Sequence, residues 1–224
     1  MNVLLFGATG MIGQGVLHEC LLDPRVRRVV TVGRGATGQT HPKLRELVRS
    51  DVSDLAPLEA ELHGVDACVF CLGVSAAGMS EARYTTLTYD LTLAVARTLA
   101  PWNPTMTFIY VSGMGTDSTE RGRAMWARVK GRTENALLAL PLEAAYMFRP
   151  GLIEPLPGTR SRTRVYRLAY IALAPLFPVL HKFFPNHVTT ARQLGRAMLA
   201  IARNGYERPV LEVRDINRVA RGGG

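Results

Sequence analysis

Short apolar runs alternate with segments of helical periodicity over most of the chain. This alternation is typical of a parallel sheet that helices cover on both faces, because each strand of such a sheet is buried on two sides. We therefore predict an α/β fold with a doubly wound parallel sheet. The expected strands lie at residues 3–6, 29–32, 44–49, 66–72, 105–111, 144–148 and 210–213.

Helical spacing of apolar residues follows several of these strands. A first helix is expected directly after Gly13, and others at residues 55–62, 80–99, 121–140 and 190–202. In the helix at 80–99, we expect Leu87 and Ala94 to be among the residues facing the core. We expect Asp54 to cap the helix at 55–62, and Thr189 or Thr190 to cap the helix at 190–202. Prolines should end two other helices: Pro101 and Pro104 after residue 99, and Pro141 after residue 140.

A glycine-rich turn joins the first strand to the first helix. It reads Gly7-Ala8-Thr9-Gly10-Met11-Ile12-Gly13, with glycines at G-x-x-G-x-x-G spacing. Such a turn lets the backbone approach a pyrophosphate, while the helix N-terminus faces the anion. We expect the amides of Gly10, Met11 and Ile12 to meet a dinucleotide there. The alternative is an ordinary turn, which glycines also mark.

Arg34 follows the second strand, where an NAD site usually offers a carboxylate to the ribose 2′-hydroxyl. The stretch Thr31-Val32-Gly33-Arg34 has no carboxylate. A guanidinium pairs with a 2′-phosphate and stacks on an adenine ring. We therefore expect NADP(H) to be preferred, with NAD(H) as the alternative if Arg34 is only a solvated loop residue.

The ends of the third and fourth strands provide further candidate cofactor contacts. Asp51 and Val52 are expected at the adenine, although Asp51 alternatively caps a helix. Cys71, Leu72 and Gly73 are expected where the backbone passes the cofactor ribose, although Gly73 alternatively only ends the strand.

A length of 224 residues suits one α/β domain with a sizeable core. We expect a single dinucleotide-binding Rossmann domain over residues 1–220, with residues 152–189 contributing a substrate lobe, and a disordered tail at 221–224. The net charge of +9 suits an anionic cofactor, a membrane surface or nucleic acid, and equally a basic surface that only aids solubility. No basic recognition helix is evident, so no nucleic-acid partner is expected.

Three cysteines do not form a disulfide framework. Cys68 and Cys71 should point to opposite faces of one strand, because residues three apart do so. His181 and His187 lack companion ligands, so no metal site is expected. The apolar stretch 168–180 is too short to span a bilayer and contains prolines. Membrane contact is therefore not expected, and we expect a cytoplasmic protein whose first strand leaves no room for a removable leader.

Taken in chain order, the glycine turn, Asp51, Tyr110-Val111-Ser112, Val129-Lys130-Gly131-Arg132-Thr133-Glu134 and Arg149-Pro150-Gly151 resemble the short-chain dehydrogenase/reductase superfamily. The glycine spacing is similar to its extended and atypical branches, labelled NAD-dependent epimerase/dehydratase or NAD(P)H-binding. The resemblance covers about residues 2–155. It implies a Rossmann fold, cofactor contacts that extend to Pro150 and Gly151, and a dimer such as relatives form.

The resemblance also implies a Ser–Tyr–Lys catalytic site. Ser112 matches the serine that polarises a substrate carbonyl, and Lys130 matches the lysine that binds the nicotinamide ribose. Trp126 stands where the family has the tyrosine that exchanges the proton. Because an indole N–H only donates and does not titrate near neutral pH, Trp126 cannot be the acid–base. It remains a candidate wall of the nicotinamide pocket. The replacement candidates are Tyr84, Tyr89 and a bound water.

Two functions follow from these residues. The first is an NADP(H)-dependent oxidoreductase or epimerase that acts on a small carbonyl or hydroxyl compound. The second is a catalytically inactive NADP(H)-binding regulator or redox-state sensor, which Trp126 favours. An arginine group past the sixth strand suits an acidic substrate, a membrane-facing patch or a plain solvated face. Its members are Arg160, Arg162, Arg164 and Arg167.

Overall fold

The expected strands form one seven-stranded sheet in the computed structural model, which describes residues 1–157 and 176–222. The sheet strands are β1 (Asn2–Phe6), β2 (Arg28–Gly33), β3 (Leu44–Val48), β4 (Ala67–Phe70), β5 (Thr107–Val111), β6 (Ala144–Arg149) and β9 (Val210–Glu212). Their order is β3-β2-β1-β4-β5-β6-β9, and every neighbouring pair is parallel. The prediction of a doubly wound parallel sheet is confirmed.

The chain reverses its direction of travel across the sheet next to β1. From β1 it moves outward through β2 to β3, and then returns to β4 on the other side of β1. Leu4 consequently lies opposite Val30 on one side and Cys68 on the other. Ligands of open α/β sheets bind at such a reversal, beyond the carboxyl ends of the strands. The glycine turn follows β1 and so lies at this point.

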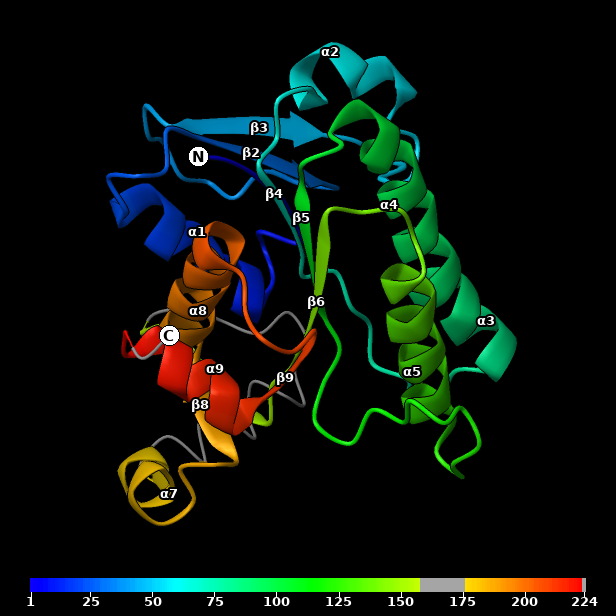
Figure 1. The fold of residues 1–224 in the computed structure, drawn as a ribbon, viewed down its shortest axis with the longest axis vertical. Coiled ribbons are helices and arrows are strands. Elements are labelled where there is room, and N and C mark those ends of the chain that lie inside the picture. Colours follow the sequence, from blue (N-terminus) through cyan, green and yellow to red (C-terminus); the bar gives the residue numbers. More distant parts are fainter. Residues whose placement is uncertain (158–175, 223–224) are drawn as a thin grey trace.

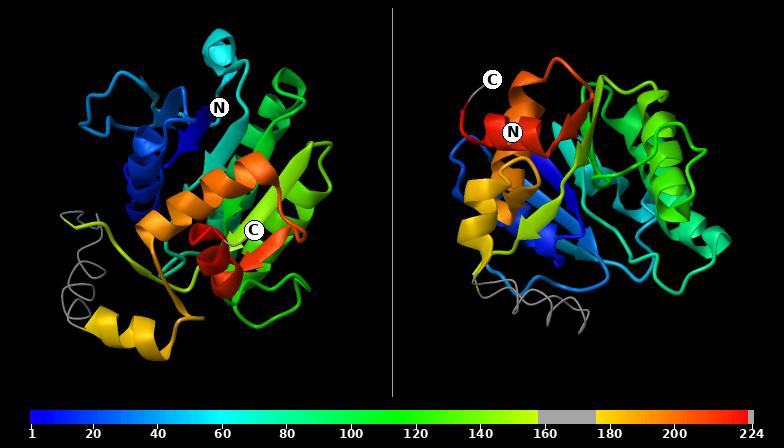
Figure 2. Two further views of the ribbon diagram at one scale, coloured as in Figure 1. Left: turned by 60° about the vertical axis from the view of Figure 1, so that its left-hand side comes forward. Right: turned by 90° about the horizontal axis from the view of Figure 1, so that it is seen from below.

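Helices cover both faces of the sheet (Figures 1 and 2). One face carries the first helix and two C-terminal helices, and the other carries the helices from the middle of the chain. On the first face are α1 (Met11–Leu22), α8 (Ala191–Asn204) and α9 (Val213–Ala220). On the second are a 3₁₀ turn η1 (Ala56–Leu58), α2 (Glu59–Leu62), α3 (Glu81–Thr85), a π turn η2 (Thr86–Asp90), α4 (Leu91–Trp102) and α5 (Met125–Leu138).

The helix expected at 80–99 is a continuous run from α3 through η2 to α4. The π turn changes the helical phase, so Leu87 and Ala94 are exposed rather than core-facing, while Leu93 and Leu99 are buried. The helix also continues past Pro101 to Trp102. A proline in the last turn removes only one intrahelical hydrogen bond, so it does not stop the helix there.

Two other helix boundaries differ from expectation. Asp54 caps no helix but pairs with Arg49 at 3.6 Å, and the segment that follows forms only η1 and the single turn α2. Helix α5 begins at Met125 instead of residue 121. The Asp117 carboxylate accepts bonds from the amides of Thr119 and Gly122, which holds this stretch as a loop.

Four C-terminal elements of the described ranges were not expected, namely β7 (Leu152–Glu154), β8 (Val188–Thr190), α7 (Phe177–Phe183) and the helix α9 described above. Strands β7 and β8 form a separate parallel pair, and α7 lies between them in the chain. Thr190 caps α8 as expected, in a capping box with Gln193. Arg221 and Gly222 donate backbone bonds to the end of α9. The expected disorder of the tail stays a prediction, and residues 223–224 lie outside the described ranges.

No helix in the described ranges has both the length and the apolar character that crossing a membrane requires. Within residues 1–157 and 176–222, no group of three His, Cys, Asp or Glu side chains is placed to hold a metal ion.

Candidate functional site

The glycine turn brings the end of β1 against the end of β4. Gly7 has φ of 80°, and a methyl group there would lie 2.8 Å from the carbonyl carbon of Cys71. A methyl group on Gly13 would lie 2.0 Å from the carbonyl oxygen of Gly7, so the first turn of α1 rests directly on the bend. Only glycine suits either position, as the strand–turn–helix interpretation requires.

The N-terminus of α1 offers backbone amides to an anion. Gly10 is the N-cap, and no described side chain caps this end. The amide of Gly10 itself donates to the carbonyl oxygen of Gly7 at 2.9 Å, which corrects our expectation that it faces the pyrophosphate. Met11 and Ile12 lie in the first turn, where amides have no acceptor within the helix. The cradle that the glycines leave open therefore fits a dinucleotide phosphate.

A cleft connects this turn with the end of β2. Thr9, Arg34 and Leu72 line it, as sequence analysis anticipated for cofactor contacts. Arg34 is exposed and forms no ion pair with the residues that the structure describes. The remaining lining residues are Gly7, Ala8, Thr31, Val32, Gly33, Gly35, Glu46, Leu47 and Val48.

Glu46 is a cleft residue that sequence analysis missed. Its carboxylate oxygen Oε1 accepts a hydrogen bond from the amide of Thr37 at 2.6 Å. The register of β3 against β2, which pairs Glu46 with Thr31, sets it beside the cleft. A carboxylate inside the strand that pairs with β2 is the signal that would have drawn attention to it.

Asp51 and Val52 lie apart from this cleft. Asp51 accepts bonds from the hydroxyl of Ser53 and from its amide at 2.8 Å, and these bonds lower the pKa of Asp51. Val52 is buried in the core beneath α2 and α4. The expected contact with adenine stays a prediction, as does the role of Asp51 there.

The two cysteines of β4 and its end face opposite cores, as predicted. Cys68 packs in the core on the α4 side, and Cys71 packs against the core on the α1 side. All three cysteines are free thiols. Burial raises the pKa of Cys68 and of Cys71, which keeps both thiols protonated. A methyl group on Gly73 would meet nothing within 4 Å, so the space beside Gly73 is open.

A buried polar network occupies the carboxyl end of β5. The hydroxyl of Ser112 donates to Glu134 Oε1 and lies 3.2 Å from the carbonyl oxygen of Phe148. Glu134, fully buried on α5, also receives a bidentate ion pair from Arg149 at the end of β6. Sequence analysis missed Glu134 and Arg149 as site residues. The spacing of four between Lys130 and Glu134, which places both on one helix face, was the available signal.

Lys130 joins the same end of the sheet. Its side-chain nitrogen donates to the backbone carbonyl oxygen of Ser112. Burial lowers the pKa of Lys130 to about 8, although the nearby Glu134 carboxylate opposes that shift. The structure therefore brings Ser112 and Lys130 together, as the resemblance implies, but through the serine backbone.

Trp126 lies one helical turn before Lys130, against the loop that follows β5. A methyl group on Gly115 would lie 3.4 Å from its ring, and Gly115 has φ of 85°. The two tyrosines considered as replacement acids are engaged in packing. Tyr84 is buried, which raises its pKa, and the Tyr89 ring carries the guanidinium of Arg132 4.4 Å from its centroid.

Pro150 and Gly151 have packing roles in the structure. The carbonyl oxygen of Pro150 accepts from the amide of Met114 at 2.8 Å. A methyl group on Gly151 would lie 2.3 Å from the carbonyl oxygen of His187, so glycine is required where β7 meets β8. Their contacts with a cofactor stay a prediction. The predicted group of Arg160, Arg162, Arg164 and Arg167 lies outside the described residues.

Curated relatives resemble most of the chain. Protein fmp52, mitochondrial, from Emericella nidulans is 31% identical over 170 residues, which cover 73% of this chain and 70% of the relative. Several further relatives from Aspergillus species and Chaetomium globosum also carry mitochondrial names. These names contradict our expectation of a cytoplasmic protein, which is therefore wrong. The chain's first strand, from which we argued against a leader, carries no information on compartment.

Solved structures share the fold. A UDP-glucose 4-epimerase superposes with a TM-score of 0.70 at 17% identity, over 99% of this chain and 82% of that chain. The Bordetella bronchiseptica enzyme WbmF in complex with NAD+ superposes with a TM-score of 0.68 at 14% identity, over 98% and 76%. At these identities the likeness shows the fold alone.

The family itself is shown by sequence. The model of the family described as "NAD dependent epimerase/dehydratase family" matches residues 3–118, which include β1 to β5, the glycine turn and the cleft. Together with the relative described above, this match confirms the resemblance to the short-chain dehydrogenase/reductase superfamily. The chain belongs to the NAD dependent epimerase/dehydratase family, whose members are NAD(P)-dependent.

Proposed function

We propose that this protein is an NADP(H)-dependent oxidoreductase or epimerase that acts on a small carbonyl or hydroxyl compound. The observation that carries the proposal is the cleft between the glycine turn and β2, into which the exposed Arg34 brings a positive charge that forms no ion pair within residues 1–157 and 176–222. A 2′-phosphate is the anion that distinguishes NADP(H) from NAD(H), and a guanidinium binds it in two-pronged geometry.

Residues of this chain divide the binding of the cofactor among them. The amides of Met11 and Ile12 bind the pyrophosphate, Arg34 binds the 2′-phosphate, and Lys130 binds the nicotinamide ribose. When bound, the cofactor supplies or accepts the hydride. Glu46 limits the preference for NADP(H), because its carboxylate shares the cleft with Arg34. Its bond to the Thr37 amide holds that carboxylate in place.

Lys130 is the group that holds the exchangeable proton in this proposal. Trp126 cannot titrate, burial raises the pKa of Tyr84, and the guanidinium of Arg132 lies over the Tyr89 ring. Lys130 stands at the carboxyl end of β5 with an ammonium that burial makes easier to deprotonate. In the reducing direction, its ammonium gives one proton to the substrate oxygen and becomes a neutral amine.

A second candidate function is NADP(H) binding without turnover. One observation favours it: the Ser112 hydroxyl donates to the buried Glu134 carboxylate. A hydroxyl has one proton, so Ser112 cannot polarise a substrate carbonyl while this bond holds. In that case Ser112 positions α5, and the protein reports the redox state of the nucleotide.

Titration with NADPH and NADH, followed by the fluorescence of Trp102 and Trp126, tests the proposal. Saturable binding with preference for NADPH supports the cofactor assignment. NADPH consumption with a panel of carbonyl compounds then supports the enzyme, whereas tight binding with no turnover on any of them supports the sensor. Absence of binding at millimolar nucleotide would overturn both functions.

A further inference from the structure

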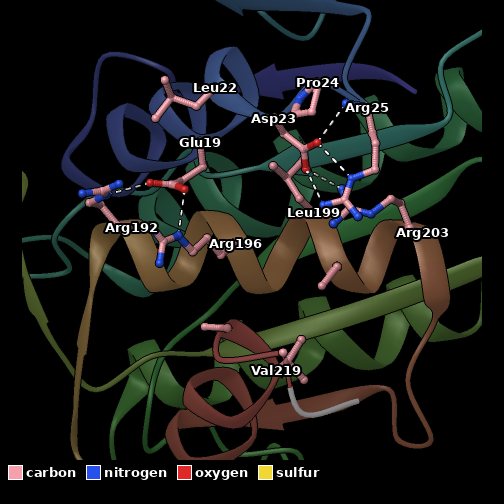
Figure 3. A pocket seen from close by; sticks show the side chains of 13 residues that line it. Glu19, Leu22, Asp23, Pro24, Arg25, Arg192, Arg196, Leu199, Arg203 and Val219 are labelled. Carbon is pink, nitrogen blue, oxygen red and sulfur yellow. Dashed lines mark hydrogen bonds and ion pairs between the residues drawn. The ribbon is translucent and has the colours of Figure 1, made fainter.

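Helices α1 and α8 cross at very short range because both carry glycine at the contact. A methyl group on Gly15 would lie 2.4 Å from the carbonyl oxygen of Ala191, and one on Gly195 would lie 2.9 Å from the carbonyl oxygen of Gly15. This crossing brings Glu19 of α1, and Asp23 directly after α1, over arginines of α8, as Figure 3 shows.

The first of these acidic residues, Glu19, holds two arginines. Its carboxylate accepts from Nε of Arg192 at 2.8 Å and from Nε of Arg196 at 2.9 Å. Burial raises the pKa of Glu19, but the bonds from both arginines outweigh burial and lower it overall, so the carboxylate stays ionised. The terminal nitrogens of both guanidinium groups have no hydrogen-bond partner among the described residues. Both side chains are about half exposed.

Asp23, one turn further along, holds a second pair. It accepts from Nε of Arg25 at 3.0 Å and from Arg203 at 2.8 Å. Burial opposes the shift, but the bonds from Arg25 and the charge of Arg203 lower the pKa of Asp23 to about 2. Lys43 donates to the carbonyl oxygens of Leu21 and Asp23, which offsets the negative pole at the end of α1.

The two carboxylates and their four arginines surround a cleft of about 430 Å³, which we call the arginine cleft. Four guanidinium groups against two carboxylates leave an excess of two positive charges. Apolar side chains form the rest of the wall, and such a mixture is typical of small-ligand sites. The lining residues are Glu19, Leu22, Asp23, Pro24, Arg25, Arg192, Arg196, Leu199, Ala200, Arg203, Val219, Ala220 and Gly222.

We propose that the arginine cleft binds an organic phosphate, whose phosphate oxygens meet the terminal nitrogens of Arg192 and Arg196 and whose apolar part lies on Leu199. The planar guanidinium group matches phosphate oxygens in pairs, and Glu19 has already fixed both groups in place. The glycine turn precedes α1, and Glu19, which holds both arginines, lies eight residues beyond Met11, about 12 Å along the helix axis. The arginine cleft is therefore separate from the nucleotide site and does not depend on the proposed function.

Calorimetric titration with phenyl phosphate at constant ionic strength tests this site. The wild-type protein is titrated with and without saturating NADPH, so that any binding at the glycine turn is counted separately. We expect R192Q/R196Q to raise the Kd at least about tenfold, because charged hydrogen bonds to the phosphate are lost. The matched control R83Q/R97Q removes the same charge from exposed positions on α3 and α4 and should change the Kd less than twofold.

Loss of folding in R192Q/R196Q is checked by circular dichroism, and R192K/R196K keeps the charges if the glutamine variant fails to fold. In the wild-type protein, the Nε–H NMR signals of Arg192 and Arg196 should shift on titration. Unshifted signals, or equal loss of affinity in the control pair, would overturn the proposal. Sedimentation with phosphatidylcholine vesicles containing phosphatidic acid separates the sources. If the protein pellets with these vesicles and phenyl phosphate reverses the pelleting, the ligand is a lipid headgroup. If the protein binds phenyl phosphate but does not pellet, the ligand is a free phosphate ester.

Discussion

The side-chain nitrogen of Lys130 donates a hydrogen bond to the backbone carbonyl oxygen of Ser112. This bond joins the middle of α5 to the carboxyl end of β5, so the lysine is held at the site whether or not the serine hydroxyl takes part in chemistry. Burial there lowers the pKa of Lys130 to about 8, from an ordinary value of 10.5. Two measurable consequences follow for the lysine, one for stability and one for turnover.

Between pH 8 and 10.5, the unfolded chain binds more protons at Lys130 than the folded protein does. The free energy of unfolding therefore rises with pH through this window, while below pH 8 the folded protein carries the full cost of a buried ammonium. Urea denaturation measures this effect in wild type and K130M. As the pH rises from 8 to 10.5, the free energy of unfolding of wild type should increase by roughly 1–3 kcal/mol relative to that of K130M. For the control K182M, at an exposed lysine, the difference from wild type should not change with pH in this way. If the difference between wild type and K130M does not change with pH either, the lowered pKa of Lys130 is contradicted.

If Lys130 gives the proton, turnover in the reducing direction falls as pH rises through about 8. A guanidinium stays charged at these pH values, so K130R should lose this fall while retaining part of its affinity for NADPH. The pH profile of kcat/KM distinguishes this acid role from ribose binding alone. An unchanged profile in K130R would assign the proton to another group.

The cofactor preference depends on Arg34. R34A should weaken NADPH binding about tenfold or more, because a charged hydrogen bond to phosphate contributes on the order of 1.5–3 kcal/mol. NADH binding should change less than twofold. E46Q, which removes the carboxylate from the same cleft, should strengthen NADPH binding and leave NADH binding weaker or unchanged. Fluorescence titration measures all of these, and R97A, on an exposed face of α4, is the matched control. Equal losses for both nucleotides in R34A would remove the case for a 2′-phosphate site.

The ion pair of Glu134 with Arg149 is buried, so breaking one side of it is expensive. E134A leaves the Arg149 charge and the Ser112 hydroxyl without their partner, and should lower the free energy of unfolding by roughly 3–5 kcal/mol. E134M/R149M should recover much of this loss, because no buried charge remains unpaired. Arg149 also contacts Glu212 at 3.3 Å, but that side chain is half exposed. E212A should therefore cost less than about 1 kcal/mol by the same urea measurement. Equal losses of unfolding free energy in E134A and E212A would contradict the burial of the Glu134–Arg149 pair.

Trp126 can be exchanged for the tyrosine that the resemblance leads us to expect at its position. W126Y supplies a titratable hydroxyl on the same face of α5 as Lys130, one turn away. We expect W126Y to bind NADPH as wild type does and to turn over carbonyl compounds faster. W126F, which removes the indole without supplying a hydroxyl, controls for the change of size. No gain over W126F would indicate that the space beside Gly115 does not admit a substrate.

Much of the fold was predictable because parallel strands are buried on both faces, so their apolar runs stand out. The glycine turn was predictable as well, since Gly7 and Gly13 each exclude a side chain. The π turn was not predictable, because no residue type marks it. It changes the helical phase, and as a result Leu87 is exposed and Leu93 is buried. Helix α9 was missed, although Val213, Ile216 and Val219 recur at helical spacing, because its eight residues follow a strand without a break.

The site was predictable residue by residue but not as a network. Sequence analysis placed Ser112 and Lys130 in one site, yet the partner of the serine hydroxyl is Glu134, 22 residues away. That contact depends on how α5 docks on the sheet, and the Arg149 contact depends on the register of β6 against β5. Long-range geometry of this kind has no local signature. The arginine cleft has the same origin, because Glu19 and Arg192 meet only through the crossing of α1 and α8.

The position of β9 has a consequence for how the protein is made. β9 is the edge strand, and Met147 of β6 pairs with Val210, which the ribosome adds much later. At about 5–20 residues per second, translation of the intervening segment takes several seconds. During that interval the nascent sheet presents β6 as an open edge, to which a strand of another chain can add. The newborn protein is therefore exposed to pairing with its neighbours along the strand that ends in Arg149 until β9 has been made.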